Sequence, residues 1–197
     1  MKQEERRQQT IRLLLEATKE LIREKGCHAV TMRDIMEKSG LSKGSIFHYV
    51  ATKDELFAWV LQERLEQTNE RFMRQVGHGG ADFAGPMQQI AATLPALEDR
   101  KEITNKVLIY LLGKDDDPTV EAVLKRFYDR WIELSRQWIV TGQEHGVIPE
   151  SVDADKTAEL FVLLSLGLRT RASLPVHSTA FSADDFAKLI IERLSGK

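Results

Sequence analysis

Residues 31–57 of this chain, TMRDIMEKSGLSKGSIFHYVATKDELF, predict two short helices joined by a turn. Thr31 is suited to cap the first helix, and Gly40 interrupts it because glycine readily leaves the helical conformation. Ser42 is suited to cap the second helix, which spans barely two turns. Two short helices around a glycine-containing turn are typical of a helix-turn-helix, whose second helix enters the major groove of DNA. The stretch therefore predicts a DNA-binding element.

The second of these helices has one apolar face and one polar end. Ile46 and Val50 lie four residues apart, so we expect them to face inward together with Ile35. The N-terminal end carries small or hydrogen-bonding residues, which are Ser42, Lys43, Gly44 and Ser45. This polar end is the part that is expected to approach the base edges.

The rest of the sequence predicts an all-α fold. Apolar residues recur at spacings of three and four, and no alternation of β-branched residues indicates a strand. We expect Gly26 to end the first helix, and Thr52 with Glu55 to form a capping box at the start of the fourth. The expected helices, about nine in number, cover about residues 4–25, 31–39, the two turns after Ser42, 52–76, 82–98, 101–112, 117–145, 153–174 and 183–194.

Composition and charge narrow the class of protein. Of 197 residues, 42% are hydrophobic and 29% are charged, and no apolar run approaches the roughly 18 residues of a membrane span, so a soluble protein is expected. The charged start MKQEERRQQT lacks the apolar segment of a secretory signal, and the single cysteine, Cys27, permits no internal disulfide. These features predict a cytoplasmic protein.

The charge is distributed unevenly along the chain. Residues 1–55 hold 11 lysines and arginines against 9 aspartates and glutamates, a net charge of +2. Residues 56–197 hold 17 against 21, a net charge of −4. A basic N-terminal segment suits contact with phosphates, and the acidic remainder indicates a different role for the body.

Residues 31–57 resemble the helix-turn-helix signature of the TetR family of transcriptional regulators. The matching residues are Thr31, Ile35, Gly40, Leu41, Ser45, Ile46, Phe47, His48, Tyr49, Val50, Lys53 and Leu56. The match covers about residues 10–60, and the helix count extends the resemblance to the whole chain. Two positions depart from the family: Ala51 stands where many members have lysine, proline or glycine, and Cys27 stands where an aromatic residue is usual.

The resemblance implies a DNA-binding domain at residues 1–52 and a helical effector-binding and dimerisation domain at residues 53–197. It implies groove contacts from Arg33, Ser42, Lys43, Gly44, Ser45 and His48, and phosphate contacts from Thr31, Tyr49, Thr52 and Lys53. Independently of the family, the free backbone N–H groups at the starts of the second and fourth helices suit an anion. The alternative for the motif is a short αα-corner in an ordinary helical protein.

A homodimer is expected, because one reading helix covers only a few base pairs and two copies match a palindromic operator. Residues 158–168, AELFVLLSLGL, are apolar nearly all round and need partners on two sides. As in the family, the last two helices could form an intermolecular four-helix bundle, through Leu160, Phe161, Leu163, Leu164, Leu168, Phe186, Leu189, Ile190 and Leu194. The alternative is that this helix is buried wholly within its own chain.

The resemblance also implies a pocket for a small effector between the fourth and eighth helices. Its candidate lining residues are Trp59, Phe72, Met73, Met87, Ile90, Leu94, Tyr110, Phe127, Trp131 and Trp138, although residues of these types are more often core than pocket wall. Few basic residues interrupt the apolar positions of the fifth to seventh expected helices, which favours an uncharged or lipophilic effector. A regulator of this kind releases its operator when the effector binds.

Other classes of protein find little support. The five histidines are scattered without metal-ligand spacing, Cys27 fits a small buried thiol, and residues 114–117, KDDD, fit a helix N-terminus better than a calcium loop, so neither metal nor cofactor is expected. No phosphate-binding loop, dinucleotide fingerprint or hydrolase motif occurs, so an enzyme is not expected. The remaining alternative is an architectural protein of the same fold that spreads along DNA without a ligand.

Overall fold

The computed structural model describes residues 3–78, 90–114, 116–176 and 180–196 of the chain. Within these ranges it contains eight α-helices, one 3₁₀ helix and no strand, which confirms the predicted all-α fold. The elements are α1 (Gln3–Ala29), α2 (Met32–Ser39), α3 (Lys43–Phe47), α4 (Lys53–His78), η1 (Leu94–Glu98), α6 (Ile103–Leu112), α7 (Pro118–Glu144), α8 (Ala154–Ser173) and α9 (Ala183–Leu194).

One of the expected helices differs from the prediction. Most of the helix expected at residues 82–98 lies outside the described residues, and its last part is the 3₁₀ helix η1. Pro95 stands in the first turn of η1, and proline cannot donate the backbone hydrogen bond that would continue a helix from residue 90.

Gly26 interrupts α1 with a non-helical backbone conformation, since its φ is 76° and its ψ is 162°. The regular part of the first helix therefore ends at Gly26 as predicted, and the short segment of residues 27–29 completes α1.

Local side-chain caps begin the short helices, as the sequence predicts. The Thr31 hydroxyl accepts a hydrogen bond from the backbone N–H of Asp34, and the Asp34 carboxylate accepts one from the backbone N–H of Thr31. Ser42 caps α3 in the same way through its hydroxyl. At α4 the expected capping box is altered, because the Glu55 carboxylate accepts from the backbone N–H of residue 51 at 2.7 Å and not from that of Thr52.

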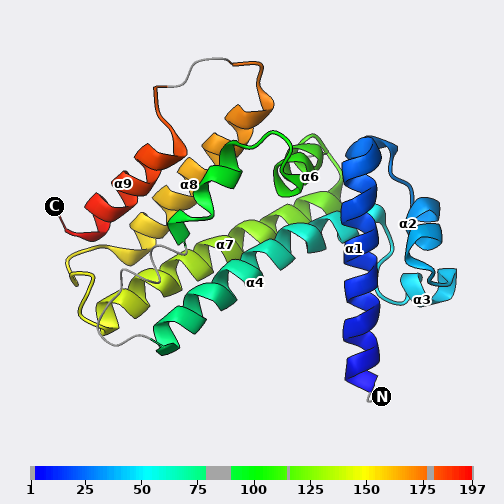
Figure 1. Cartoon of the computed structure of the whole chain (residues 1–197), viewed down its shortest axis with the longest axis horizontal. Coiled ribbons are helices and arrows are strands. Elements are labelled where there is room, and N and C mark those ends of the chain that lie inside the picture. Colours follow the sequence, from blue (N-terminus) through cyan, green and yellow to red (C-terminus); the bar gives the residue numbers. More distant parts are fainter. Residues whose placement is uncertain (1–2, 79–89, 115, 177–179, 197) are drawn as a thin grey trace.

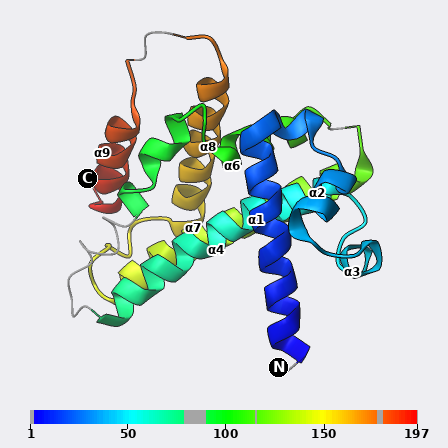
Figure 2. The same cartoon turned by 45° about the vertical axis from the view of Figure 1, so that its right-hand side comes forward.

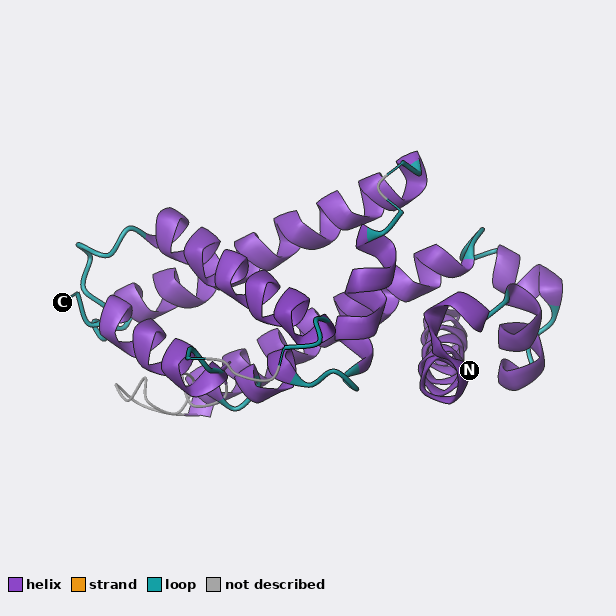
Figure 3. Ribbon diagram, turned by 90° about the horizontal axis from the view of Figure 1, so that it is seen from above, coloured by secondary structure: helices purple, strands orange, loops and turns teal. Residues whose placement is uncertain are grey.

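The chain is elongated, with α1, α2 and α3 at one end and α8 and α9 at the other (Figures 1 and 3). Helices α4 and α7 pack along each other and connect the two ends, and α6 lies between α1 and α8 (Figure 2). One hydrophobic cluster joins α1, α2 and α3 to α4, α6 and α7, so the core is continuous across residues 52 and 53. A second cluster joins η1, the end of α7, α8 and α9.

The described helices include none that is both long enough and apolar enough to cross a lipid bilayer.

Candidate nucleic-acid interface and ligand pocket

Helix α3 is held by a small apolar anchor. Ile46 and Ile35 are fully buried, and Val50 is 3% exposed, so these three side chains lie in the core as predicted. The opposite side of α3 is open to solvent: Lys43 and His48 are both exposed there. A helix of five residues has little stability of its own, so its position depends on this apolar anchor and on the Ser42 cap.

The residues predicted to contact DNA gather around α3. Arg33 is exposed in the first turn of α2, and the exposed Thr52 stands just before α4. Three of the predicted residues are half-buried: Ser45, Tyr49 and Lys53. The remaining five are exposed, and these are Thr31, Ser42, Lys43, Gly44 and His48. The structure thus brings the predicted set to one end of the chain, and the individual DNA contacts stay predictions.

The Lys53 side chain makes contacts that the sequence did not indicate. Its ammonium donates to the backbone carbonyl oxygens of Cys27, His28 and Val30, at 3.2, 3.3 and 2.7 Å. The same ammonium lies 5.3 Å from the ring centroid of Tyr110. These three acceptors match the three N–H donors of an ammonium, so Lys53 joins the end of α1 to the start of α4. Its predicted phosphate contact stays a prediction.

Phe47 is a candidate contact that the sequence-based set omitted. Its ring is 43% exposed on α3, and the Lys43 ammonium lies 5.7 Å from the ring centroid. An exposed aromatic ring beside a cation is suited to contact the methyl group of a thymine. The position matched the family signature, but its exposure depends on how α3 is rotated against the core, which local periodicity over five residues does not define.

Acidic residues neutralise some of the basic groups at this end of the chain. Lys25 pairs with Asp34 at 2.6 Å, and Lys38 pairs with Glu24 at 2.6 Å. The hydrogen bonds from Lys25 and Thr31 lower the pKa of Asp34 to about 2. Among the described residues, neither Arg33 nor Lys43 takes part in an ion pair. Both cations are therefore available to phosphates.

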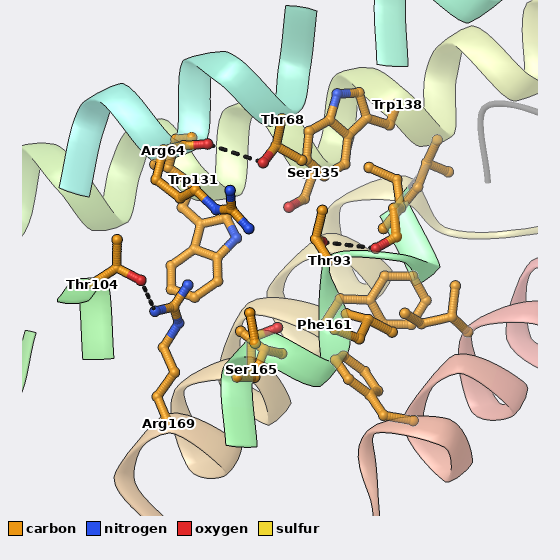
Figure 4. A pocket seen from close by; sticks show the side chains of 18 of the residues that line it. Arg64, Thr68, Thr93, Thr104, Trp131, Ser135, Trp138, Phe161, Ser165 and Arg169 are labelled. Carbon is orange, nitrogen blue, oxygen red and sulfur yellow. Dashed lines mark hydrogen bonds between the residues drawn. The ribbon is translucent and has the colours of Figure 1, made fainter. Parts of the chain in front are cut away.

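A cavity of about 90 Å³ lies among α4, η1, α6, α7, α8 and α9, and Figure 4 shows part of its lining. Four of the predicted pocket residues line it: Ile90, Leu94, Trp131 and Trp138. Most of its wall is apolar, and Phe161, Phe186, Ile190 and Leu194 add to it from α8 and α9. These last four residues had been predicted for the dimer interface.

The other predicted pocket residues lie elsewhere. Trp59 and Phe127 line a separate depression between α4 and α7, and Tyr110 lines another beside Cys27. Phe72 is fully buried against Trp138, with the ring centroids 5.5 Å apart. Met73 is 38% exposed, and Met87 lies outside the described residues. Apolar spacing shows that a helix has a buried face, but it does not show which neighbouring helix that face meets. The sequence therefore could not separate residues that line this cavity from residues buried elsewhere.

Polar side chains in the cavity were missed by the sequence-based prediction. Arg64 enters from α4 and Arg169 from α8, with Thr104, Ser135 and Ser165 beside them (Figure 4). Arg169 is only 8% exposed, and its Nη1 donates to Thr104 Oγ1 at 2.9 Å and to Asn105 Oδ1 at 2.6 Å. Arginine side chains are usually exposed and are almost never buried without a partner. An arginine in a helix therefore indicates a surface residue, and no signal in the sequence showed that Arg169 lines a cavity.

The predicted dimer residues divide into three groups by exposure: buried, exposed and half-buried. Leu168, Phe186, Ile190 and Leu194 are at most 7% exposed within their own chain, so the structure assigns them to the monomer core. This corrects their assignment to the interface, because the inner face of α9 packs on η1 and α8. Leu160 and Leu163 on α8 are 37% and 52% exposed. Leu164, Leu189 and Phe161 are half-buried, and Ile191, which was not predicted, is 58% exposed.

Cys27 is buried in the bend after Gly26, with 5% of its surface exposed. Burial raises the pKa of its thiol to about 11. A thiol with so high a pKa is almost entirely protonated at neutral pH and is a poor nucleophile.

Among the described residues, no three histidine, cysteine, aspartate or glutamate side chains lie together in a group that could hold a metal ion.

Comparison with known proteins places the chain in a family. The family model described as "Bacterial regulatory proteins, tetR family" matches residues 14–60, which contain α2, α3 and the start of α4. The HTH-type transcriptional regulator PksA of Bacillus subtilis (strain 168) is 37% identical over 174 residues, which cover 87% of this chain and 80% of PksA. The chain belongs to the TetR family.

Solved structures of this TetR fold superpose over nearly the whole chain. A TetR-family transcriptional regulator from Syntrophomonas wolfei has a TM-score of 0.67 at 18% identity, covering 94% of this chain and 93% of that one. A transcriptional regulator from Saccharomonospora viridis, solved in complex with choline, has a TM-score of 0.59 at 22% identity, covering 94% and 95%. As a TetR-family member, this protein is a DNA-binding transcriptional regulator, a non-enzymatic role.

Proposed function

We propose that this TetR-family protein is a homodimeric repressor that binds a palindromic operator and releases it when a small effector enters the cavity. The effector has a largely apolar body, since apolar side chains form most of the cavity wall. The observation that best supports the proposal is the position of α6, which has one end at the cavity and the other end at the DNA-binding region.

At its first turn, α6 contributes Thr104 to the cavity wall and Asn105 to the hydrogen bond with Arg169. At its last turn, the Tyr110 ring packs edge-on against His28 with the centroids 4.9 Å apart. Just beyond α6, the Lys114 ammonium donates to the Asp54 carboxylate at 2.6 Å. A displacement of α6 at the cavity therefore acts directly on the ends of α1 and α4.

The Lys114–Asp54 pair is partly buried and strengthens this connection. Burial opposes the charge on Lys114, but its hydrogen bonds to Asp54 and Tyr110 outweigh that effect and raise its pKa to about 12. Lys114 therefore stays charged throughout the physiological pH range. Its contact with Asp54 is the part of this junction through which a change of effector occupancy would be transmitted.

An effector acts on DNA affinity only if it binds one conformation better than the other. We propose that it favours a separation of the two α3 helices that no longer fits successive major grooves, which lie about 34 Å apart. The choline complex of the Saccharomonospora viridis regulator supports the premise that this fold holds small molecules. In this chain the cavity is enclosed by six elements of the body.

The dimer is proposed to form through the exposed side of α8 together with α9. Leu160, Leu163 and Gly167 follow one another at helical spacing and are all exposed, and Ile191 is exposed on α9. Apolar side chains exposed in a row at helical spacing suit an isologous two-fold contact. Residues 1–52 would then form the DNA-binding unit of each copy, with the rest as the effector and dimer unit.

In the DNA-bound dimer, α3 would lie in the major groove. Lys43, Gly44 and Ser45, with Ser42, Arg33 and His48, are proposed to face the groove. Thr31, Tyr49, Thr52 and Lys53 are proposed to lie beside phosphates, where the N-termini of α2 and α4 add backbone N–H groups.

The test is selection of bound sequences from a random DNA pool, followed by titration of the selected site. A dimeric repressor enriches a palindrome and saturates at two chains per site. Lys43→Ala should reduce affinity at least about tenfold while the control Lys125→Ala, which removes a 74% exposed lysine on α7, leaves it unchanged. Equal affinity in both variants would refute the role of α3, and cooperative coating without a preferred site would identify the architectural alternative.

A further inference from the structure

Arg169 is a buried cation whose protein contacts use only one side of its guanidinium. Both of its hydrogen bonds leave from Nη1, to Thr104 and Asn105. The Nε–H is buried and has no acceptor among the described residues. In Figure 4 the edge that carries Nε and the remaining amino group is turned away from Thr104, towards the side of the cavity where Ser165 lies.

The surroundings of Arg169 carry positive charge without a direct counterion. Within the described residues, no carboxylate forms an ion pair with Arg169 or with Arg64, which lines the same cavity. Glu102 is connected to Arg169 only through Thr104, whose hydroxyl accepts a hydrogen bond from Arg169 and donates one to the Glu102 carboxylate at 3.4 Å. Burial lowers the pKa of Arg169 to about 10; the negative charge of Glu102 opposes this effect and the neighbouring Arg64 adds to it, and the group stays protonated at neutral pH.

A purely structural role explains only part of this arrangement. Asn105 donates to the carbonyl oxygens of Ala96, Leu97 and Asp99, so Arg169 helps to hold η1 against α6 through Asn105. That role needs one nitrogen of the guanidinium. It leaves a buried charge without a direct ion pair and a buried donor without an acceptor, and both raise the free energy of the folded state.

An anion would remove both costs. The free Nε–H and the second amino group form the side-on fork that matches the two oxygens of a carboxylate. The Trp131 ring, 5.4 Å from Arg169 Cζ, and the apolar wall beyond it offer a surface for a hydrocarbon body. At about 90 Å³ the cavity is smaller than the roughly 150 Å³ engineered cavity that accepts benzene, so the body is short.

We propose that the cavity binds a small organic carboxylate, with the carboxylate on the free edge of Arg169 and a short apolar body along Trp131 and Phe161. The proposal rests on the effector function proposed above and names the chemical class of the effector. It replaces the uncharged effector expected from the sequence. That expectation considered the expected helices five to seven, whereas the two arginines come from α4 and α8.

The test compares three probes with one short carbon skeleton: butanoate, butanamide and butylammonium. Titration calorimetry measures their affinity, and the fluorescence of Trp131 and Trp138, both in the cavity wall, reports entry. The wild-type protein should bind butanoate at least about tenfold more tightly than butanamide, and butylammonium more weakly still. Arg169→Met should abolish the preference for butanoate, while Arg136→Met, on the outer surface of α7, should retain it.

Several results would overturn the assignment. Equal affinities for butanoate and butanamide in the wild-type protein would do so, as would an unchanged preference in Arg169→Met. If Arg169→Met does not fold, the wild-type comparison still decides, and Arg64→Met should weaken the preference because it removes the second cation. Failure of all short carboxylates, from acetate to pentanoate, to bind would also overturn it.

Release of DNA is measured separately, by fluorescence anisotropy of a labelled operator selected from the random pool. Butanoate binding that depends on Arg169 but leaves operator affinity unchanged would uphold the carboxylate site and refute effector-controlled release. Release of the operator by butanamide as readily as by butanoate would uphold the regulatory function and refute the carboxylate site.

Discussion

Replacing Lys53 with methionine separates a structural role from a DNA-binding role. Methionine keeps most of the hydrocarbon stem but removes an ammonium that donates to three carbonyl oxygens at the end of α1. The His28 carbonyl is exposed and regains a water molecule, whereas the other two are partly buried. At about 1.5 kcal/mol for each hydrogen bond from a charged donor, these two bonds contribute about 3 kcal/mol, and partial rehydration reduces the loss to about 2 kcal/mol.

The assays are urea unfolding and thermal unfolding, both followed by far-ultraviolet circular dichroism. For a chain of this length, a loss of about 2 kcal/mol corresponds to a Tm that is about 4–8 °C lower. Lys125→Met is the matched control, because Lys125 is 74% exposed and pairs only with Asp129 on its own helix. We expect that control to stay within about 0.5 kcal/mol of the wild type.

The same variant is then titrated with operator DNA at several salt concentrations. Loss of one phosphate contact lowers affinity similarly for all sequences and lowers the salt slope by about 1. Unchanged stability combined with that lower slope would refute the structural role and assign Lys53 to the phosphate backbone. A loss of about 2 kcal/mol with an unchanged slope supports the contacts seen in the structure.

Two further variants test the cap of α2 and the dimer face. The pKa of Asp34 is lowered from 3.8 to about 2, so its contribution to stability is complete above about pH 4 and is lost as pH falls through about 2. Asp34→Asn should therefore flatten this part of the acid unfolding curve, and an unchanged curve would contradict the cap. Leu163→Glu places a charge on a side chain that is 52% exposed on α8 and should yield monomers in sedimentation velocity. Leu112→Glu, at the end of α6 and 45% exposed, should remain dimeric, and dimers of both variants would exclude the proposed face.

The sequence was a good guide where structure is local. The caps at Thr31 and Ser42 were predictable because an N-cap depends on residues only three positions apart. The inward positions of Ile35, Ile46 and Val50 were predictable because helical spacing defines a face.

The sequence was a poor guide where structure is long-range. Arg169 lies about 65 positions from the partners that bury it, and its own helix reads simply as apolar with charged ends. Phe186 and Ile190 are apolar whether they meet a second copy or their own η1, so composition could not choose between core and interface. Lys53 reaches the end of α1 from 23 to 26 positions away, so its contacts with these carbonyl oxygens gave no local signal in the sequence.

The hydrogen bonds of Lys53 join the start of α4 to the end of α1, so a movement of α4 would be transmitted to the DNA-binding region. From Lys53 to His78 the helix has 26 residues and a length of about 39 Å. Because the first residue of α4 is fastened to α1, a tilt of about 5° around the far end would carry the attached three-helix head about 3 Å sideways. That displacement is close to the rise of one base pair, about 3.4 Å, so such a rotation at one end of the molecule would shift the other end by about one step of DNA.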